Sequence, residues 1–220
     1  MNLKMNKTGW KLQKQRGFTV VDIAGVIVGA GLALGIAVQG ADVVSSARYA
    51  QFYDELQVME TQLWTFYEKQ GRWPGDCNSD GVMGFQPVNA VDSVVDFKPV
   101  QRGCKAESLL TALQDLKAKG VIAADIDNGE VLMHEFGHFF QLGHTFSPTN
   151  SALKSNVIVA YGIPQHVAAK LDLEIDGVEN GMQGRLRRWD EQGMGTAWPN
   201  AEADDSSLVA LAYFFESKIP

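Results

Sequence analysis

The longest apolar stretch of the chain runs from Phe18 to Gly40 and contains a single charged residue, Asp22. As a helix, these residues would extend about 35 Å at 1.5 Å per residue, more than the ~30 Å apolar core of a bilayer. An acid inside such a segment costs about 2.5–3.5 kcal/mol on insertion scales, so it calls for a partner or a role. The stretch therefore predicts a membrane-spanning helix, and its single carboxylate is expected to have a binding partner or a functional role.

A second pattern begins where the first one ends. Between Ala41 and Gln70, apolar side chains recur at steps of three and four residues and mark one side of an amphipathic helix. This stripe consists of Tyr49, Phe52, Tyr53, Leu56, Met59, Leu63, Phe66 and Tyr67. Gly71 is a plausible helix cap, and the sequence Trp73-Pro74-Gly75-Asp76 ends the element. Joined to the apolar run, the stripe predicts one helix of about 53 residues, roughly 80 Å long.

The remainder of the chain alternates turns, helices and strands. Helices are expected over Ala106–Lys119, closed by Gly120, and from Pro164 to Ile175, closed by Asp176-Gly177. Apolar and β-branched runs predict the strands Val131–Phe146, Ser155–Ile163, Gly184–Trp189 and Leu208–Phe215. The expected architecture is α+β, with one long N-terminal helix packed on a small antiparallel β-sheet.

Charge separates the first 17 residues, called the leader below, from the rest of the chain. The first 17 residues carry five cations and no acid, which under the positive-inside rule keeps the N-terminus in the cytoplasm. The whole chain has a formal net charge of −7 and is more acidic still without these residues, so nucleic acid is not expected as a partner. The one basic cluster, Arg185, Arg187 and Arg188, is interpreted as a solvated strand face. A secretory signal peptide stays an alternative, because Ala33, Ala37 and Ala41 are small and would allow Ala-x-Ala-like cleavage near residues 37–43.

The junction between leader and apolar run carries a resemblance. The sequence Gly17-Phe18-Thr19-Val20-Val21-Asp22, followed by the apolar run, resembles the start of type IV prepilins and pseudopilins. The resemblance implies that a prepilin peptidase cuts after Gly17 and methylates Phe18. In that family the fifth mature residue is normally glutamate, which neutralises the N-terminal amine of a neighbouring subunit. Here it is Asp22, one methylene shorter. The segments Tyr67–Asp76 and Ile163–Trp189 also resemble the helix exit and the helix–turn–strand unit of pilin-like heads.

This resemblance implies an organisation and a function. It divides the chain into a leader at 1–17, a transmembrane and filament-core helix at 18–40, its amphipathic half at 41–71 and a globular α+β head at 72–220. The implied function is that of a structural subunit of a type IV pilus or a type II secretion pseudopilus, without catalysis. The precursor would cross the inner membrane once, with its head in the periplasm, before entering an extracellular pilus or a periplasmic pseudopilus. The implied partners are the prepilin peptidase, other subunits, an inner-membrane assembly platform and membrane lipid. A minor tip subunit with an adhesive or DNA-binding role stays open.

A competing motif lies in the second half of the chain. The string HEFGHFFQLGH, His134 to His144, resembles the metzincin metalloprotease signature, in which two imidazoles on one helix face bind zinc and Glu135 is the base. The glycine of that signature between the second and third histidines is Gln141 here. The aromatic residues of the string suit a strand pair broken at Gly137 and Gly143 equally well. A structural role is favoured, and a membrane-anchored zinc metalloprotease stays the alternative.

A second metal motif follows the long helix. Asp76, Asn78 and Asp80, with Gly81 after them, match positions 1, 3, 5 and 6 of an EF-hand calcium loop. Position 12, normally a bidentate glutamate, is Pro87, and Asp92 is the acid that could stand in for it. The alternative is a plain Asx turn after Pro-Gly. Calcium is therefore a possible cofactor, bound by Asp76, Asn78 and Asp80.

The chain has two cysteines, Cys77 and Cys104. In an oxidising compartment such as the periplasm, a disulfide between them is the favoured state, with two free thiols as the alternative. The bridge would enclose about 28 residues and, on the chain-entropy model, contribute about 3–4 kcal/mol. It would join the loop after the long helix to the start of the next helix.

Overall fold

The computed structural model describes residues 20–87, 109–147, 153–190, 193–194, 197–198 and 207–216, and it does not describe the side chains of residues 20–44. The chain divides into two compact units, Met1–Ser46 and Ala47–Pro220. In the first unit, the described residues belong to the N-terminal part of helix α1. The second unit, called the head below, contains the C-terminal part of α1 and every other described element.

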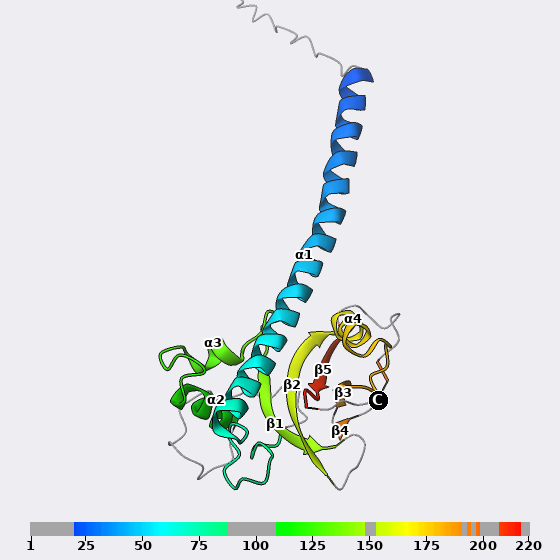
Figure 1. Ribbon diagram of the computed structural model, residues 1–220. Coiled ribbons are helices and arrows are strands. Elements are labelled where there is room, and N and C mark those ends of the chain that lie inside the picture. Colours follow the sequence, from blue (N-terminus) through cyan, green and yellow to red (C-terminus); the bar gives the residue numbers. More distant parts are fainter. Residues whose placement is uncertain are drawn as a thin grey trace, which may run out of the picture. The chain divides into compact units, whose positions relative to one another are not determined.

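Helix α1 spans Val20–Gln70, 51 residues without a break (Figure 1). It ends where the glycine signal predicts, because Gly71 adopts a left-handed conformation with φ 68°. The amide of Gly71 donates to the carbonyl of Tyr67 at 2.8 Å and closes the last turn. The prediction of one long helix that continues past the apolar run is confirmed for the backbone from Val20 onward.

Three shorter helices belong to the head: α2 (Leu109–Ala118), α3 (Asn128–Leu132) and α4 (Gln165–Asp176). Helix α4 begins after Pro164 and ends at Gly177, whose φ is 76° and whose amide donates to the carbonyl of Leu173, as the flanking proline and glycine predict. Helix α2 lies within the predicted Ala106–Lys119; residues 106–108 of that prediction lie outside the described residues.

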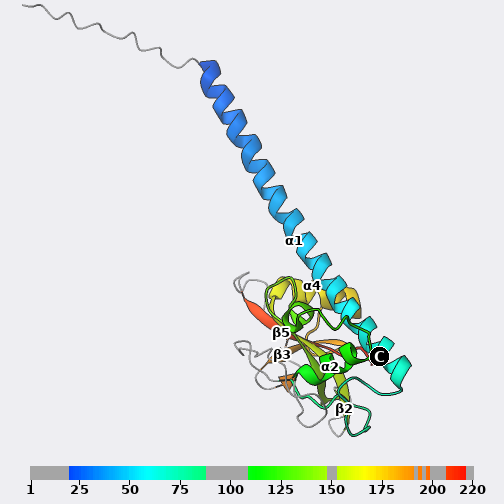
Figure 2. The same ribbon diagram turned by 90° about the vertical axis from the view of Figure 1, so that its left-hand side faces the viewer.

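Within the described residues, the strands form one antiparallel sheet in the order β1-β2-β5-β3-β4. Their bounds are Phe140–Phe146 for β1, Lys154–Pro164 for β2, Leu186–Asp190 for β3, Gly193–Met194 for β4 and Leu208–Tyr213 for β5. Both ribbon views place α4 beside the end of β2 (Figures 1 and 2). The expected α+β class with a small antiparallel sheet is confirmed.

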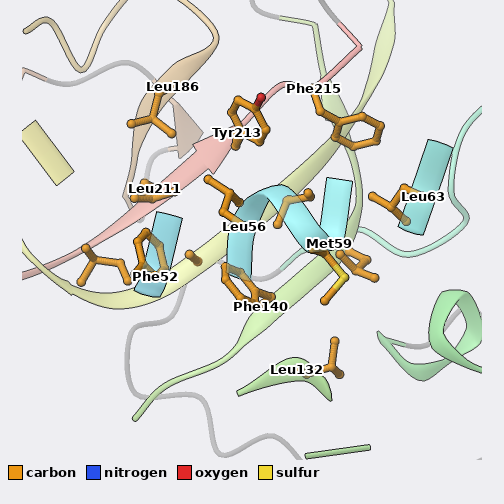
Figure 3. Close-up of a cluster of buried hydrophobic side chains, with 14 of the residues drawn as sticks. Phe52, Leu56, Met59, Leu63, Leu132, Phe140, Leu186, Leu211, Tyr213 and Phe215 are labelled. Atoms are coloured by element: carbon orange, nitrogen blue, oxygen red, sulfur yellow. The ribbon is translucent and has the colours of Figure 1, made fainter. Parts of the chain in front are cut away.

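The apolar stripe of α1 packs in the main core of the head. Tyr49, Phe52, Leu56, Met59, Leu63 and Phe66 are all buried, at alternating steps of three and four residues. Figure 3 shows Phe52, Leu56 and Met59 pointing toward side chains of the sheet such as Phe140 and Leu211. Tyr53 and Tyr67, which the stripe also contained, lie at its margins, half-buried and exposed. The stripe is therefore the face by which the C-terminal part of α1 packs on the other elements of the head.

Strand β2 is buried on both faces. Ile158 and Ala160 belong to the main core, whereas Val157, Val159 and Tyr161 pack in a second cluster with residues of β3 and β5. A register shift interrupts the pairing with β5 between Ala160 and Ile163. A sheet with apolar side chains on both faces explains why this strand reads as a continuous β-branched run rather than an alternating one.

The outer edge of β1 is covered in its middle by the segment that follows the calcium-like loop. The amide of His144 donates to the carbonyl of Phe85 at 2.8 Å. A Cβ atom on Gly143 would lie 2.3 Å from that same oxygen, so only glycine allows so close an approach. At the other edge of the sheet, β4 has two residues.

The prediction of a strand over Val131–Phe146 is wrong in its first half. Helix α3 occupies the chain up to Leu132, because Asp127 caps it with a side-chain bond to the amide of Gly129 at 2.8 Å. A turn follows, in which the amide of Gly137 donates to the carbonyl of His134 at 2.8 Å. Met133 and Phe139 form an isolated antiparallel bridge across this turn, and the regular strand begins at Phe140. One bridge, one tight turn and one strand therefore replace the expected strand pair.

Candidate functional site

The residues on which the resemblance rests lie at the margin of the structure. Gly17 and Phe18 are outside the described residues, and Asp22 is described only as backbone within α1. Cleavage, methylation and the contact of Asp22 with a neighbouring amine therefore stay predictions. In the part of the chain that the structure describes, no helix combines the length and apolarity needed to cross a bilayer.

Polar contacts reinforce the attachment of α1 to the head. The hydroxyl of Tyr213 on β5 donates to Glu60 Oε2 on α1 at 2.7 Å, and Arg185 Nη2 donates to that hydroxyl at 2.7 Å. Arg185 Nη2 also lies 3.6 Å from Glu60 Oε1. About three turns of α1 before Glu60, the hydroxyl of Tyr49 donates to Glu174 on α4. Together with the apolar stripe, these side chains hold α1 against both α4 and β5.

The arginine cluster, interpreted from the sequence as a solvated strand face, is half-buried, and Arg185 directly precedes β3. Arg185 donates to the carbonyl of Phe215 at 3.2 Å, and Arg187 donates to the carbonyls of Gly184 at 3.0 Å and Met182 at 2.8 Å. Arg188 donates to the carbonyl of Ala197 at 2.8 Å. Burial lowers the pKa of Arg187, against the opposing charge of Asp176. These guanidinium groups therefore join β3 and the residue before it to neighbouring loops.

Two aspartates one helical turn apart on α4 hold the loop that leads to β3. Asp172, completely buried, accepts bonds from Trp198 Nε1 at 2.7 Å and from the amide of Asn180 at 2.6 Å. Asp176 accepts from the amides of Arg185 at 2.9 Å and Leu186 at 2.8 Å. Burial, more than the nearby Asp176, raises the pKa of Asp172 above its usual range. The sequence analysis did not identify this pair. The feature that could have indicated it is Asp172, an acid among the apolar residues on the buried face of α4.

The histidine string lacks the helix that a metzincin site needs. His134 and His138 lie at the two sides of the turn after α3, and His144 lies in β1. The ring of His134 contacts the carbonyl of Tyr161 through Nε2 at 2.9 Å and accepts from the amide of Phe136 at Nδ1, at 3.3 Å. Both ring nitrogens are thus engaged with the main chain. Neutral imidazole, with one donor and one acceptor nitrogen, matches these two partners.

The other residues of the string are also engaged elsewhere. The carboxylate of Glu135, the base of the metzincin reading, pairs with Arg48 Nε at 2.9 Å. His144 Nδ1 contacts the carbonyl of Met83. Among the described residues, no group of three or more histidine, cysteine, aspartate and glutamate side chains is arranged to hold a metal ion. The geometry therefore agrees with the structural role favoured from the sequence and does not fit a zinc site.

Burial of His134 predicts a pH dependence of stability. Burial lowers the pKa of His134 to about 4, against the carbonyl of Tyr161, which favours the protonated ring, and with a small repulsion from His138. The unfolded chain, with an ordinary histidine pKa of about 6.5, binds a proton first as pH falls. The contribution of His134 is therefore complete above pH about 6.5 and is lost between there and pH about 4, by about 3 kcal/mol.

Comparing wild type with His134→Gln by urea unfolding, at several pH values from 7 to 4.5, isolates this effect. The advantage of wild type should shrink on acidification. Asp172 and Glu216, whose pKa values burial raises, change stability in the opposite direction, but they are present in both proteins and cancel in the difference. A difference that does not change with pH would show that His134 does not titrate in this way.

The calcium-like loop is described in full from Asp76 to Val82. Asp76 is buried, with 2% of its surface exposed, and its Oδ2 accepts from the amide of Gly81 at 3.1 Å. The amide of Asp80 donates to Asn78 Oδ1 at 3.2 Å, and the amide of Val82 donates to Asp80 Oδ1 at 3.1 Å. The Asx turns of the alternative reading are therefore present. Asp92 lies outside the described residues.

Cys77 occupies the second position of this loop and is disulfide-bonded. The chain has one other cysteine, Cys104, which lies outside the described residues. The predicted bridge between these two residues is compatible with the state of Cys77. The loop is thus fixed covalently as well as by hydrogen bonds.

We compared the chain with known protein families, curated proteins and solved structures. We found no family model, no curated protein and no solved structure that matches this chain.

Proposed function

We propose that this chain is a structural subunit of a helical filament, either a type IV pilus or a type II secretion pseudopilus. The observation that carries the proposal is the continuous helix α1, which follows the Gly17-Phe18 junction by two residues and runs to Gln70. In the proposed role, a peptidase removes the leader after Gly17 and methylates Phe18. The apolar segment Phe18–Gly40 then leaves the inner membrane and packs with its equivalents in the filament core.

The head supports this proposal through the way in which it holds α1. The buried stripe from Tyr49 to Phe66 and the bonds of Glu60 and Tyr49 fix the C-terminal part of the helix in the head. The boundary between the two compact units falls within the helix, at Ser46 and Ala47. A helix that is anchored at one end and carries a separate apolar segment at the other is suited to joining a head to a filament core.

The alternatives have less support. A metalloprotease needs two imidazoles facing one metal, whereas His134 uses both ring nitrogens on main-chain groups. A DNA-binding tip subunit needs free cations, whereas Arg187 and Arg188 donate to carbonyls.

The test of the proposal is the N-terminus of the mature protein. Mass spectrometry of the chain from its native host should find a species that begins at N-methylated Phe18, and antibodies to the head should label filaments in electron micrographs. A mature chain that begins near residues 38–42 would instead indicate signal peptidase cleavage. That result, or processed chain that is absent from filaments, would overturn the proposal.

Asp22 gives a second test that separates assembly from processing. Asp22→Ala should be cleaved and methylated but should enter filaments poorly, because no carboxylate then neutralises the neighbour's amine in an apolar surrounding. The measurement is the ratio of filament-bound to membrane-bound chain on immunoblots. Asp22→Glu, which restores the longer side chain, should assemble at least as well as wild type. If Asp22→Ala assembles like wild type, the aspartate has no role in assembly.

A further inference from the structure

The loop that follows α1 contains a buried carboxylate oxygen without a hydrogen-bond partner. Asp76 has 2% of its surface exposed, and its Oδ2 bonds to the amide of Gly81 across the loop. Its other oxygen, Oδ1, is buried and finds no hydrogen-bond donor in the described structure. Removing a carboxylate oxygen from water without giving it a donor is unfavourable, so this oxygen calls for a cation.

The hydrogen bonds that shape the loop leave oxygens for a cation. Asp76 and Asp80 each use one carboxylate oxygen to accept a main-chain amide, from Gly81 and Val82 respectively. Their second oxygens are Asp76 Oδ1, which has no hydrogen-bond partner in the described structure, and Asp80 Oδ2, which accepts from the side-chain Nδ2 of Asn78 at 3.0 Å. The loop is thus folded around its acids without consuming their full capacity as ligands.

The backbone of the loop is bent as a short oxygen-ligand loop requires. Ser79 is the only non-glycine residue with positive φ among those described, at 58°, and Gly81 follows at 88°. These two left-handed residues alternate with the side chains at the first, third and fifth positions of the motif. The seventh position is Val82, whose counterpart in an EF-hand loop supplies a main-chain carbonyl.

From the unpartnered oxygen of Asp76 and the arrangement around it, we propose that the loop Asp76–Val82 binds one calcium ion. The ligands are the side-chain oxygens of Asp76, Asn78 and Asp80 and the carbonyl of Val82, with water completing the shell. All are hard oxygen donors, which suit Ca²⁺ rather than zinc. This proposal does not rest on the filament function, because a single chain contains all the ligands.

The surroundings of the loop favour binding and also limit its strength. The disulfide at Cys77 and the bonds from Arg72 Nη1 to the carbonyls of Trp73 and Asp76 hold the loop in shape, which reduces the entropy lost when an ion orders it. Lys154 and Asp80 line the same pocket, so the ammonium group of Lys154 competes with the ion for Asp80. With Pro87 in place of the bidentate glutamate, we expect a Kd of about 10⁻⁴–10⁻³ M, as in extracellular calcium modules.

Terbium luminescence tests the proposal on the full-length chain in detergent. Tb³⁺ replaces Ca²⁺ in oxygen sites and emits when a nearby tryptophan is excited, and the carbonyl of Trp73 accepts from the amide of Asp76 at 3.2 Å. We expect saturable emission with one Tb³⁺ per chain, displaced by Ca²⁺ but not by the same concentration of Mg²⁺. Calcium should also raise the Tm of the wild-type chain by mass action.

Three matched substitutions locate the ion. Asp76→Asn and Asp80→Asn keep an oxygen for the amides of Gly81 and Val82 but remove a charge, and each should weaken binding at least tenfold. Asp80 is exposed, so its variant stays folded even if the buried Asp76 variant does not. Asp125→Asn removes one exposed charge elsewhere in the head and should bind like wild type. Absence of saturable emission, failure of Ca²⁺ to displace Tb³⁺, or wild-type affinity in Asp80→Asn would each overturn the proposal.

Discussion

Gly17→Ala should leave the chain with its leader attached and should keep it out of filaments. In the proposed processing step, the peptidase must seat the residue before the cut in an extended main-chain conformation close to its catalytic groups. Glycine offers no Cβ at this point, whereas alanine adds one where the enzyme approaches most closely. The unprocessed chain would retain five cations next to the apolar segment. Moving those charges into a filament core would cost far more than a single acid costs.

The measurement is the mass of the N-terminal peptide, together with the fraction of chain found in sheared filaments. We expect little or no peptide that begins at Phe18 and no head epitope in the filament fraction. Gly25→Ala is the matched control, because it makes the same change inside the apolar run, away from the junction. It should be processed normally. Normal processing and assembly of Gly17→Ala would remove the basis of the proposed function.

Phe52→Ala should destabilise the head by about 3–5 kcal/mol, the usual cost of removing a large aromatic side chain from a core. Phe52 is completely buried in the middle of the α1 stripe (Figure 3). Its ring centroid lies 5.6 Å from that of Phe136, 5.8 Å from that of Phe140 and 5.2 Å from that of His134. Losing this ring therefore opens a cavity between α1 and the sheet that its rigid neighbours cannot fill.

Urea unfolding followed by tryptophan fluorescence measures this loss. Phe146→Ala makes the same change at a side chain that is 56% exposed, and its effect should stay within about 0.5 kcal/mol. If Phe52→Ala is too unstable to purify, Phe52→Leu should show a smaller loss of the same sign. Equal stabilities of Phe52→Ala and Phe146→Ala would show that the stripe of α1 is not anchored in the core.

Local signals in the sequence were enough to predict the helices that begin after a proline or end before a glycine. Helix α1 ends at Gln70 because Gly71 can adopt positive φ, and α4 lies between Pro164 and Gly177, where proline and glycine predict its ends. The spacing of the α1 stripe likewise predicted which side of the helix the core would cover. These features depend on residues that are neighbours in the chain, so short-range physics decides them.

Features that depend on distant partners could not be predicted in the same way. Nothing near Arg185 in sequence indicates that its guanidinium bonds to Tyr213 and lies beside Glu60. The insertion of β5 between β2 and β3 is also decided by packing on both faces of the sheet. At the candidate site, the ligand spacing of the calcium-like loop was visible in the sequence. The burial of Asp76, which leaves one of its carboxylate oxygens without a hydrogen-bond partner, was not visible in the sequence.

The covered edge of β1 affects how copies of this chain can aggregate through their sheets. An exposed edge strand invites another chain to add its own strand, the route by which many β-proteins aggregate. Here the amide of His144 is already taken by Phe85, and at the opposite edge β4 offers only two residues. Among the described residues, the outer edge of β1 is therefore interrupted in its middle and the opposite edge is short. If the chain accumulates in the membrane as a precursor, as the proposed function requires, these two features would reduce its aggregation through the sheet edges before assembly.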